Sequence, residues 1–310
     1  MSFKFNRIAL GATIVLAFVA ALAMLVAMWD WNWFRHPAED YFIKRAHRDV
    51  HIGDLHVSFN RQLEPTVRLR GVYVENAPWA DQRPFASAGE ISFTFSLDSI
   101  RERRPIVSKL VLVDADIDLE RQADGHRNWR LRNPENTARG RMKVRQFEAR
   151  NTRIRFIRRD VNFEIVAASA VLEQPSGNAA GALTNQILFQ GSFEGTEFSG
   201  EMHTSDVVTI MESGVAFPIR GYMESGDTRL EVDGAVADLF RPSSMEGKVR
   251  LTGSSFSGLR PFVRGKLPRS RPYRAQAQLD QSGEVTSMKD VRVKIGGTTL
   301  AGDISYDRSG

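Results

Sequence analysis

The pattern of apolar and polar residues changes twice along the chain and so divides it into three regions. Residues 8–28 carry no charge. At ~1.5 Å per residue, a helix over them is ~30 Å long, which matches the hydrocarbon core of a bilayer. We therefore predict a transmembrane anchor over 8–28. Lys4 and Arg7 precede it without any acidic residue, so the positive-inside rule places the tail 1–7 in the cytoplasm.

A cleaved signal peptide is the alternative for this first region. Ala21-Leu22-Ala23 has the small residues of a cleavage site. The apolar run continues to Met28, however, which is longer than a signal core needs. Three tryptophans follow it, and indole rings favour the membrane–water boundary. We expect Trp29, Trp31 and Trp33 at that interface and the rest of the chain on the far side of the membrane.

The second region, residues 29–52, has a short helical pattern. Pro37 can open a helix at its first position, and Glu39 and Asp40 suit the positive end of the helix dipole. Residues 41–43 are apolar and lie beside basic residues. The pattern fits a helical segment on the membrane surface, and it fits equally a helix that caps the following domain.

The third region, residues 53–310, alternates with a period of two, which is typical of β-strands with one apolar face. Gly71 breaks the phase of its strand, as a bulge would. The longest run, residues 106–120, is ~50 Å long as a strand. We predict that one of its faces carries Val107, Val111, Val113, Ala115, Ile117 and Leu119.

Turn signals separate these runs, and no long helical pattern follows residue 53. The sequence therefore predicts a mainly β fold in which a long-stranded antiparallel β meander forms a curled sheet or groove. A sheet with one apolar face must cover that face. It either closes into a sandwich or barrel, or stays open and holds something apolar that is not protein; periodicity does not distinguish these.

Composition excludes several classes of chemistry. The chain has no cysteine, so neither disulfides nor thiol catalysis is possible. It contains no Gly-x-Ser-x-Gly, His-Glu-x-x-His or glycine-rich phosphate loop. We therefore expect no enzymatic activity, no catalytic residue and no cofactor.

Two clusters of possible metal ligands fail on spacing. Asp114, Asp116 and Asp118 begin like a calcium loop, but the glycine and glutamate that such a loop requires are absent. His47, His51 and His56 form the second cluster, in which His47 and His51 are four residues apart. That spacing brings two side chains to one metal ion only on a helix, and Gly53 indicates that the helix has ended. We expect no metal site and place the three aspartates on one solvent-facing side of a strand.

The segment 139–159 contains eight arginines and one lysine with a single acid, Glu148. The predicted topology argues against nucleic acid as its partner. Arg153 and Arg155 alternate with apolar residues, so they form the polar face of paired strands. A sharper hypothesis is that these two arginines bind phosphate headgroups, since guanidinium binds phosphate in a bidentate manner.

Short segments in a fixed order resemble landmarks of the AsmA family. They are Asp30-Trp31-Asn32, His51-Ile52-Gly53-Asp54-Leu55, Val74-Glu75-Asn76-Ala77-Pro78-Trp79-Ala80, Leu119-Glu120-Arg121, Asp124-Gly125, Asn128-Trp129, Gly265-Lys266-Leu267-Pro268, Pro272-Tyr273 and Leu300-Ala301-Gly302-Asp303-Ile304. This chain departs from the family at His47-Arg48, where members commonly have Gly-Arg. Members are usually longer, and we expect an N-terminal portion of such a protein.

The resemblance implies a single-pass bacterial inner-membrane protein whose bulk is periplasmic, with a role in outer-membrane assembly and phospholipid as its partner. On this basis we predict that the groove is lined by Ile91, Phe93, Phe95, Val111, Val113, Ile117, Phe163 and Ile165. The alternative is a scaffold for envelope assembly proteins, in which the same apolar faces pack together as a closed sandwich with no lipid path.

Overall fold

The computed structural model describes residues 29–103, 105–130, 143–176, 183–205, 208–209, 216–237, 244–259, 270–282 and 285–307. The predicted tail (1–7) and anchor (8–28) lie outside these ranges. No helix within them is long and apolar enough to cross a membrane.

A short helical segment begins the described chain. It consists of the 3₁₀ helix η1 (Trp31–Phe34) and α2 (Arg35–Ala46), which ends where His47 adopts a left-handed conformation. Strand β1 then begins at Val50, so the strand starts inside the range 29–52 that the pattern assigned to the helical segment. The difference arises because Gly53 lies within β1 and does not precede it.

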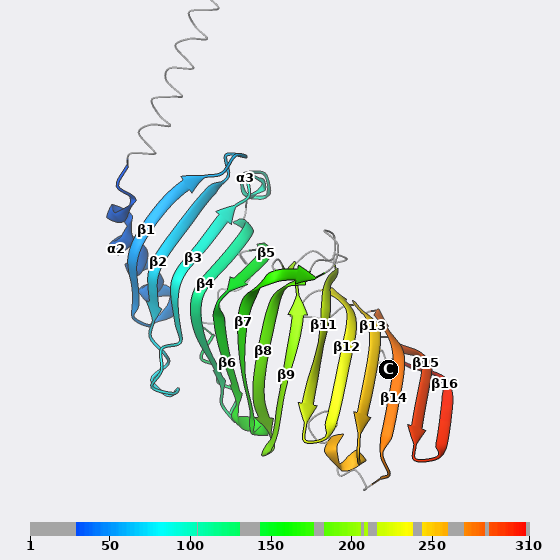
Figure 1. Cartoon of the computed structure of the whole chain (residues 1–310). Coiled ribbons are helices and arrows are strands. Elements are labelled where there is room, and N and C mark those ends of the chain that lie inside the picture. Colours follow the sequence, from blue (N-terminus) through cyan, green and yellow to red (C-terminus); the bar gives the residue numbers. More distant parts are fainter. Residues whose placement is uncertain are drawn as a thin grey trace, which may run out of the picture.

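Sixteen strands and three short helices make up the rest of the structure (Figure 1). They are β1 (Val50–Phe59), β2 (Pro65–Val74), β3 (Ala86–Phe95), α3 (Asp98–Glu102), β4 (Ile106–Arg121), β5 (Lys143–Arg150), β6 (Thr152–Arg158), η3 (Arg159–Val161), β7 (Phe163–Ser176), β8 (Leu183–Phe193), β9 (Thr196–Thr204), β10 (Val208–Thr209), β11 (Ala216–Ser225), β12 (Thr228–Ala237), β13 (Ser244–Gly253), η4 (Phe256–Leu259), β14 (Tyr273–Ser282), β15 (Val285–Ile295) and β16 (Thr298–Asp307).

The strands form one unclosed sheet with β1 and β16 as its edges. Neighbours pair antiparallel, except that β4 pairs in parallel with β5 along its first half and with β6 along its second half. The mainly β, long-stranded meander is thus confirmed, with one parallel join that alternation could not reveal. The closed sandwich is not what the described residues form, because they contain a single sheet.

A row of irregular positions crosses the first strands and bends the sheet. Gly71 has φ 57°, Asp114 has φ 51° and Asn151 has φ 47°; Gly53 and Gly89 lie beside them on β1 and β3. The side-chain amide of Asn151 donates to Asp114 Oδ1 at 2.6 Å, which fixes the row at β4. The break in phase predicted at Gly71 is confirmed, and it is one member of a row that shifts the phase of each strand it crosses. It is not a bulge with an extra residue, because the pairs on both sides of Gly71 keep one register with β1 and with β3.

Directly paired residues share a face, so the register defines an apolar face that extends from β1 to β16. One row of pairs on this face runs across fourteen strands and is apolar, glycine included, throughout: Val50, Val74, Ala86, Ile117, Ile154, Ala167, Phe189, Gly200, Met223, Leu230, Leu251, Ala275, Val293 and Leu300. We call the opposite side the polar face.

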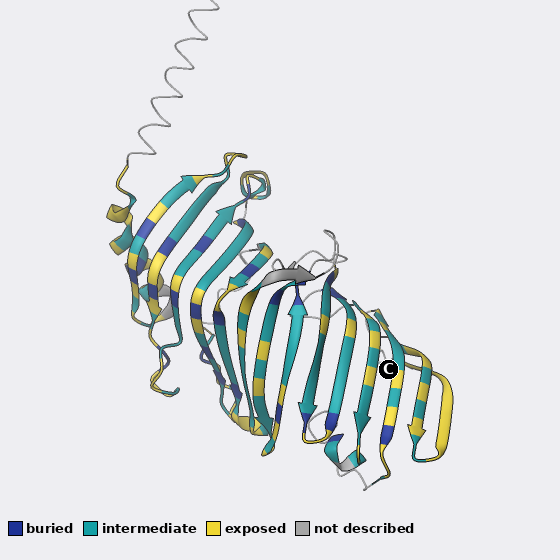
Figure 2. Ribbon diagram, viewed as in Figure 1, coloured by how far each residue is buried: buried dark blue, intermediate teal, exposed yellow. Residues whose placement is uncertain are grey.

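The packed core lies on the apolar face of β1–β4. Ile52, Leu55, Leu69 and Val72 are buried there together with Ala88 and Ala115. Trp31 and Ala38 of the helical segment pack against this cluster, so the segment does cap the sheet. Figure 2 shows buried residues in the middle of the first strands, whereas in β11–β15 they are confined to strand ends.

Candidate functional site

The apolar face of β8–β15 is the candidate functional site because it has no protein layer over it in the described ranges. Met223, Leu230, Leu251, Ala275 and Val293 follow one another across five strands and are only half-buried. The longest described helix, α2, contacts η1 and β1. An apolar strip of this length without a protein cover is unusual for a soluble monomer.

Glycines on this face form a diagonal that explains its curvature. Gly191, Gly200, Gly221 and Gly234 lie on β8, β9, β11 and β12, each one strand further and two residues displaced along the register. A Cβ atom at any of them would come within 2.1–2.3 Å of a backbone oxygen of the neighbouring strand. Only glycine permits this close approach, and glycine kinks of this kind curl a sheet.

An aromatic cluster occupies one end of the apolar face. The Phe163 ring lies 6.1 Å from Phe156, 6.0 Å from Phe198 and 6.4 Å from Phe193, between ring centroids. Trp129 extends the cluster, with its ring 5.8 Å from that of Phe156. The cluster joins β6, β7, β8 and β9, and it covers their ends with rings.

The structure brings six of the eight predicted groove residues onto the apolar face. Ile91 and Phe93 pack against the core of β1–β4, and Phe95 follows on the same side of β3. Ile117 pairs with Ala86, whereas Phe163 and Ile165 pair with Phe193 and Gly191.

The prediction is wrong for Val111 and Val113, which lie on the polar face opposite Ser92 and Glu90. The left-handed backbone at Asp114 reverses the alternation without shifting the register, so these valines do not share a face with Ala115 and Ile117. The half-buried residues of β11–β13 were not among the predicted lining, although Leu230 with Val232 and Val249 with Leu251 show the same alternation.

The two predicted headgroup arginines lie on the polar face and pair with carboxylates of the chain. Arg153 contacts Asp116 at 3.2 Å. Arg155 contacts Asp81 and Glu164 at 2.8 Å and Asp118 at 3.4 Å. Burial opposes the charge of Arg155, but Glu164 and Asp81 raise the pKa of its guanidinium above the ordinary value. These pairs are what the interpretation as the polar face of paired strands predicts.

Asp118 departs from the prediction that three aspartates face solvent. Its side chain is buried, and burial raises the pKa of its carboxyl above the usual range. Asp114 and Asp116 remain exposed. In the part of the chain that the structure describes, no group of three or more histidine, aspartate and glutamate side chains could hold a metal ion.

A buried polar cluster connects two of the sequence landmarks. Asn128 is fully buried; it donates to Asn76 Oδ1 at 3.1 Å and to the Asp118 carbonyl at 2.7 Å. Its own oxygen accepts from the Glu120 backbone N–H at 2.8 Å. The landmark residues around Asn76 and Asn128 are thus structural, since they hold the β2–β3 connection against the end of β4.

The first landmark and helix α2 cover the edge of β1 at the second landmark. Asn32 accepts from the Leu55 N–H and donates to Asp54 Oδ1, both at 2.9 Å, and Glu39 accepts from the Ile52 N–H at 2.7 Å. These bonds satisfy an edge that could otherwise pair with another chain.

The three tryptophans predicted at the membrane interface have different environments. Trp31 packs against the core of β1–β4, which removes most of its ring from any interface. Trp29 and Trp33 are exposed, at 43% and 76%, and their rings form an edge contact at 6.5 Å. Two of the three are therefore available for the interface.

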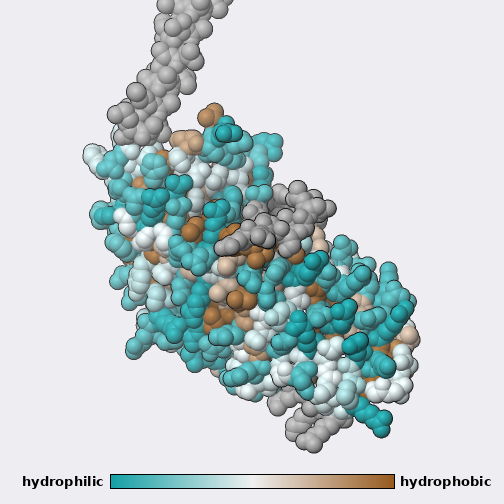
Figure 3. Space-filling view, viewed as in Figure 1, coloured by the Kyte–Doolittle hydropathy of each residue, from teal (hydrophilic) through white to brown (hydrophobic). Residues whose placement is uncertain are grey.

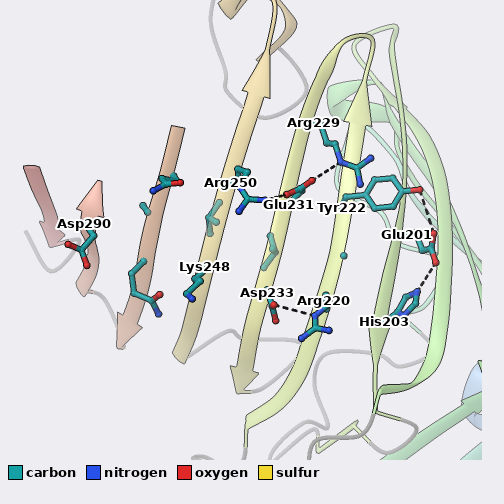
Figure 4. A pocket seen from close by; sticks show the side chains of 16 residues that line it. Glu201, His203, Arg220, Tyr222, Arg229, Glu231, Asp233, Lys248, Arg250 and Asp290 are labelled. Carbon is teal, nitrogen blue, oxygen red and sulfur yellow. Dashed lines mark hydrogen bonds and ion pairs between the residues drawn. The ribbon is translucent and has the colours of Figure 1, made fainter. Parts of the chain in front are cut away.

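The polar face forms an open pocket of about 700 Å³ over β9–β15 (Figure 4). Its charged side chains largely pair with one another: Glu201 with His203 at 2.6 Å, Arg220 with Asp233 at 3.2 Å, and Arg250 with Glu231 at 2.8 Å. Hydrophilic side chains cover most of the side shown in Figure 3 as well, with apolar patches near its centre.

Comparison with known proteins agrees with the resemblance seen in the sequence. The chain is 22% identical over 334 aligned positions to the AsmA family protein YhjG of Escherichia coli (strain K12). No family model and no solved structure matches it. The alignment covers 96% of this chain and 48% of YhjG, so the chain spans about half of that relative. Over almost its whole length, the chain is similar to a protein of the AsmA family, as its ordered landmarks predict.

Proposed function

We propose that this chain is an envelope protein, anchored in the inner membrane by residues 8–28, whose periplasmic sheet binds phospholipid acyl chains and conducts them toward the outer membrane. The observation that carries the proposal is the apolar face of β8–β15. It continues from strand to strand without a polar interruption in its central row, and the described chain offers no second layer to cover it.

The mechanism would be burial and not chemistry. Each CH₂ group kept from water is worth ~0.8 kcal/mol, so an acyl chain cannot cross an aqueous compartment unprotected. Successive strands offer similar side chains at equal register, from Met223 through Leu230 to Leu251. An acyl chain could therefore move between sites of nearly equal free energy without exposure to water.

Two leucines on neighbouring parts of the sheet provide a matched test. Leu230 lies on the apolar face, while Leu188 lies on the polar face opposite Glu201 and is 52% exposed. Phospholipid that co-purifies with the full chain would be quantified per mole of protein for the native protein, Leu230→Asp and Leu188→Asp. Lipid around the anchor is common to all three and cancels in the comparison.

We expect Leu230→Asp to lose bound phospholipid and Leu188→Asp to keep the native amount, with circular dichroism showing a folded sheet in both. Equal lipid content in the three proteins would refute the groove assignment.

A further inference from the structure

Six exposed cations gather on the polar face of β13, β14 and β15, and we call them the basic patch: Lys248, Arg250, Arg274, Lys289, Arg292 and Lys294. The register places Arg250 and Arg292 in one row on either side of Gln276, and Arg274 directly opposite Lys294. Strand spacing and rise give the patch dimensions of about 10 Å across the strands and about 13 Å along them.

The basic patch differs from the rest of the polar face in how its charges are compensated. On the earlier strands, cations lie directly opposite acids: Arg70 opposite Glu90, Asp116 opposite Arg153, and Arg220 opposite Asp233. In the basic patch, Arg250 and Lys248 still lie opposite acids, Glu231 and Asp233 of β12, and Arg250 alone forms an ion pair with a described residue, at 2.8 Å to Glu231. Arg274, Arg292 and Lys294 have no acid opposite them on either neighbouring strand. Arg274 and Lys294 face each other across the strands, an arrangement that destabilises a sheet.

Two acids of these strands, Glu246 and Asp280, lie opposite each other at the far end of the same face. Asp290 lies between Lys289 and Arg292, where the register of β15 shifts, and its backbone N–H donates to Asp303. Charge therefore changes along the strands, from a basic end at Arg274 and Lys294 to an acidic end at Glu246 and Asp280. Segregation gives the face a direction, since a negatively charged partner is attracted to one end and repelled from the other.

The exposure and spacing of the cations in the basic patch indicate which kind of anion it can bind. Its side chains are exposed and stand on an open sheet, with Lys248 and Arg250 at the border of the open pocket. A small anion would remain mostly in water there, whereas a surface that presents many phosphates in a plane would meet all six cations at once. We propose that the basic patch docks the sheet onto the surface of an anionic lipid bilayer, with the Arg274 and Lys294 end nearest the headgroups.

The test uses the full chain held by its hydrophobic segment in nanodiscs of phosphatidylcholine. Capture of added vesicles would be measured for phosphatidylcholine alone and for phosphatidylcholine mixed with phosphatidylglycerol. The variant is R274S/K294S. Its control is R68S/R220S, which removes the same charge from the same face at two arginines paired with Glu90 and Asp233.

We expect R274S/K294S to weaken capture of the mixed vesicles about 30-fold, from the attraction that each cation near an anionic surface contributes. The control should stay within about threefold of the native chain, and added salt should weaken native capture. R292S, which removes one cation opposite Gln276, should show about a fivefold loss.

Equal losses in the two double variants, or equal capture of both vesicle types by the native chain, would overturn the proposal. Misfolding is not an expected confounder, because removing the like-charged pair should leave thermal unfolding unchanged or raise its midpoint. Phospholipid that co-purifies with R274S/K294S should also be unchanged, so this result stays separate from the test of the apolar face.

Discussion

The two halves of the sheet use the same alternation of residues and yet end in different environments. On β1–β4 the apolar face is packed: Ile52 is fully buried and Leu69 is 6% exposed, under the cap made by Trp31 and Ala38. On β11–β15 the corresponding residues, such as Leu230 and Leu251, are half-buried on a single layer.

The polar face shows the same contrast. Glu120 and Glu148 are nearly fully buried beside β4 and β5, whereas charged residues of β13–β16 are exposed. The first half thus has buried side chains on both faces and can fold around an ordinary packed core. In the second half no described residue covers the apolar side chains. This difference indicates the region of the sheet where the proposed lipid would lie.

The largest expected effect comes from placing the same charge in each half. Leu69→Asp buries a carboxylate without a partner and should cost more than about 4 kcal/mol of unfolding free energy. Leu251→Asp faces a half-open layer, so we expect about 1 kcal/mol. Urea unfolding of the full chain in detergent would measure both. Similar costs would mean that the second half is as tightly packed as the first.

Arg155 lies where the two halves meet, and its removal should have the next largest effect. Arg155→Ser leaves the carboxylates of Asp81, Asp118 and Glu164 close together, with Asp118 buried. Breaking a buried pair in this way costs about 3–5 kcal/mol.

The unfolding free energy lost in Arg155→Ser should be smaller at low pH. The hydrogen bond from Arg155 holds the pKa of Asp81 below its usual value. The stabilisation that this bond gives the folded protein is therefore present above the pKa of Asp81 in the unfolded chain and is lost on acidification. Urea unfolding at neutral pH and at about pH 2 should therefore show a smaller difference between variant and native protein in acid. A difference independent of pH would show that the ion pairs are not its source.

The sequence predicts the strands of both halves but not what covers them. Alternation identified the one-faced strands, and the break in phase at Gly71 was recognisable because a glycine separates the two alternating runs. Asp114 has the same backbone role without being glycine, so nothing in its neighbourhood indicated that Val111 and Val113 change sides.

Long-range partners were equally invisible in the sequence. Arg155 and Asp81 are 74 residues apart, and only the parallel join of β4 with β6 brings Arg155 beside the β2–β3 connection that carries Asp81. Burial depends on such tertiary contacts, and a period of two cannot distinguish a packed face from an open one.

Glu148 tests the consolidated polar face of the first half. Burial opposes its ionisation, but Lys109 at 2.6 Å and Arg150 hold the pKa of its carboxyl below 4.5. Glu148→Gln should cost about 1–3 kcal/mol at neutral pH, because the two cations are partly exposed and can regain water. The stabilisation from ionised Glu148 is present above the pKa of its carboxyl in the unfolded chain, and it is lost as the pH falls through the pKa in the folded protein. The free energy of unfolding of the variant should therefore change less with pH in acid than that of the native protein.

The matched change in the open half is Glu231→Gln. Arg229 and Arg250 also lower the pKa of Glu231, but its side chain is 35% exposed, and solvent screens such pairs. We expect a smaller loss and little change in acid dependence, read from urea unfolding across the same pH range. An equal loss at both glutamates would remove the contrast between the two polar faces.

The smallest effect is expected for Arg153→Ser. This variant distinguishes a role of Arg153 in binding lipid headgroups from a role in pairing with a carboxylate of the chain. Its ion pair with Asp116 is open to water, with side chains 38% and 53% exposed. Such pairs contribute about 0–1 kcal/mol, so Arg153→Ser should leave thermal unfolding nearly unchanged. Phospholipid that co-purifies with the variant should also equal the native amount, since the apolar face lies on the other side of the sheet. A loss of lipid in a folded Arg153→Ser protein would instead restore this arginine as a headgroup ligand, and it would mean that both faces of the sheet contact the lipid.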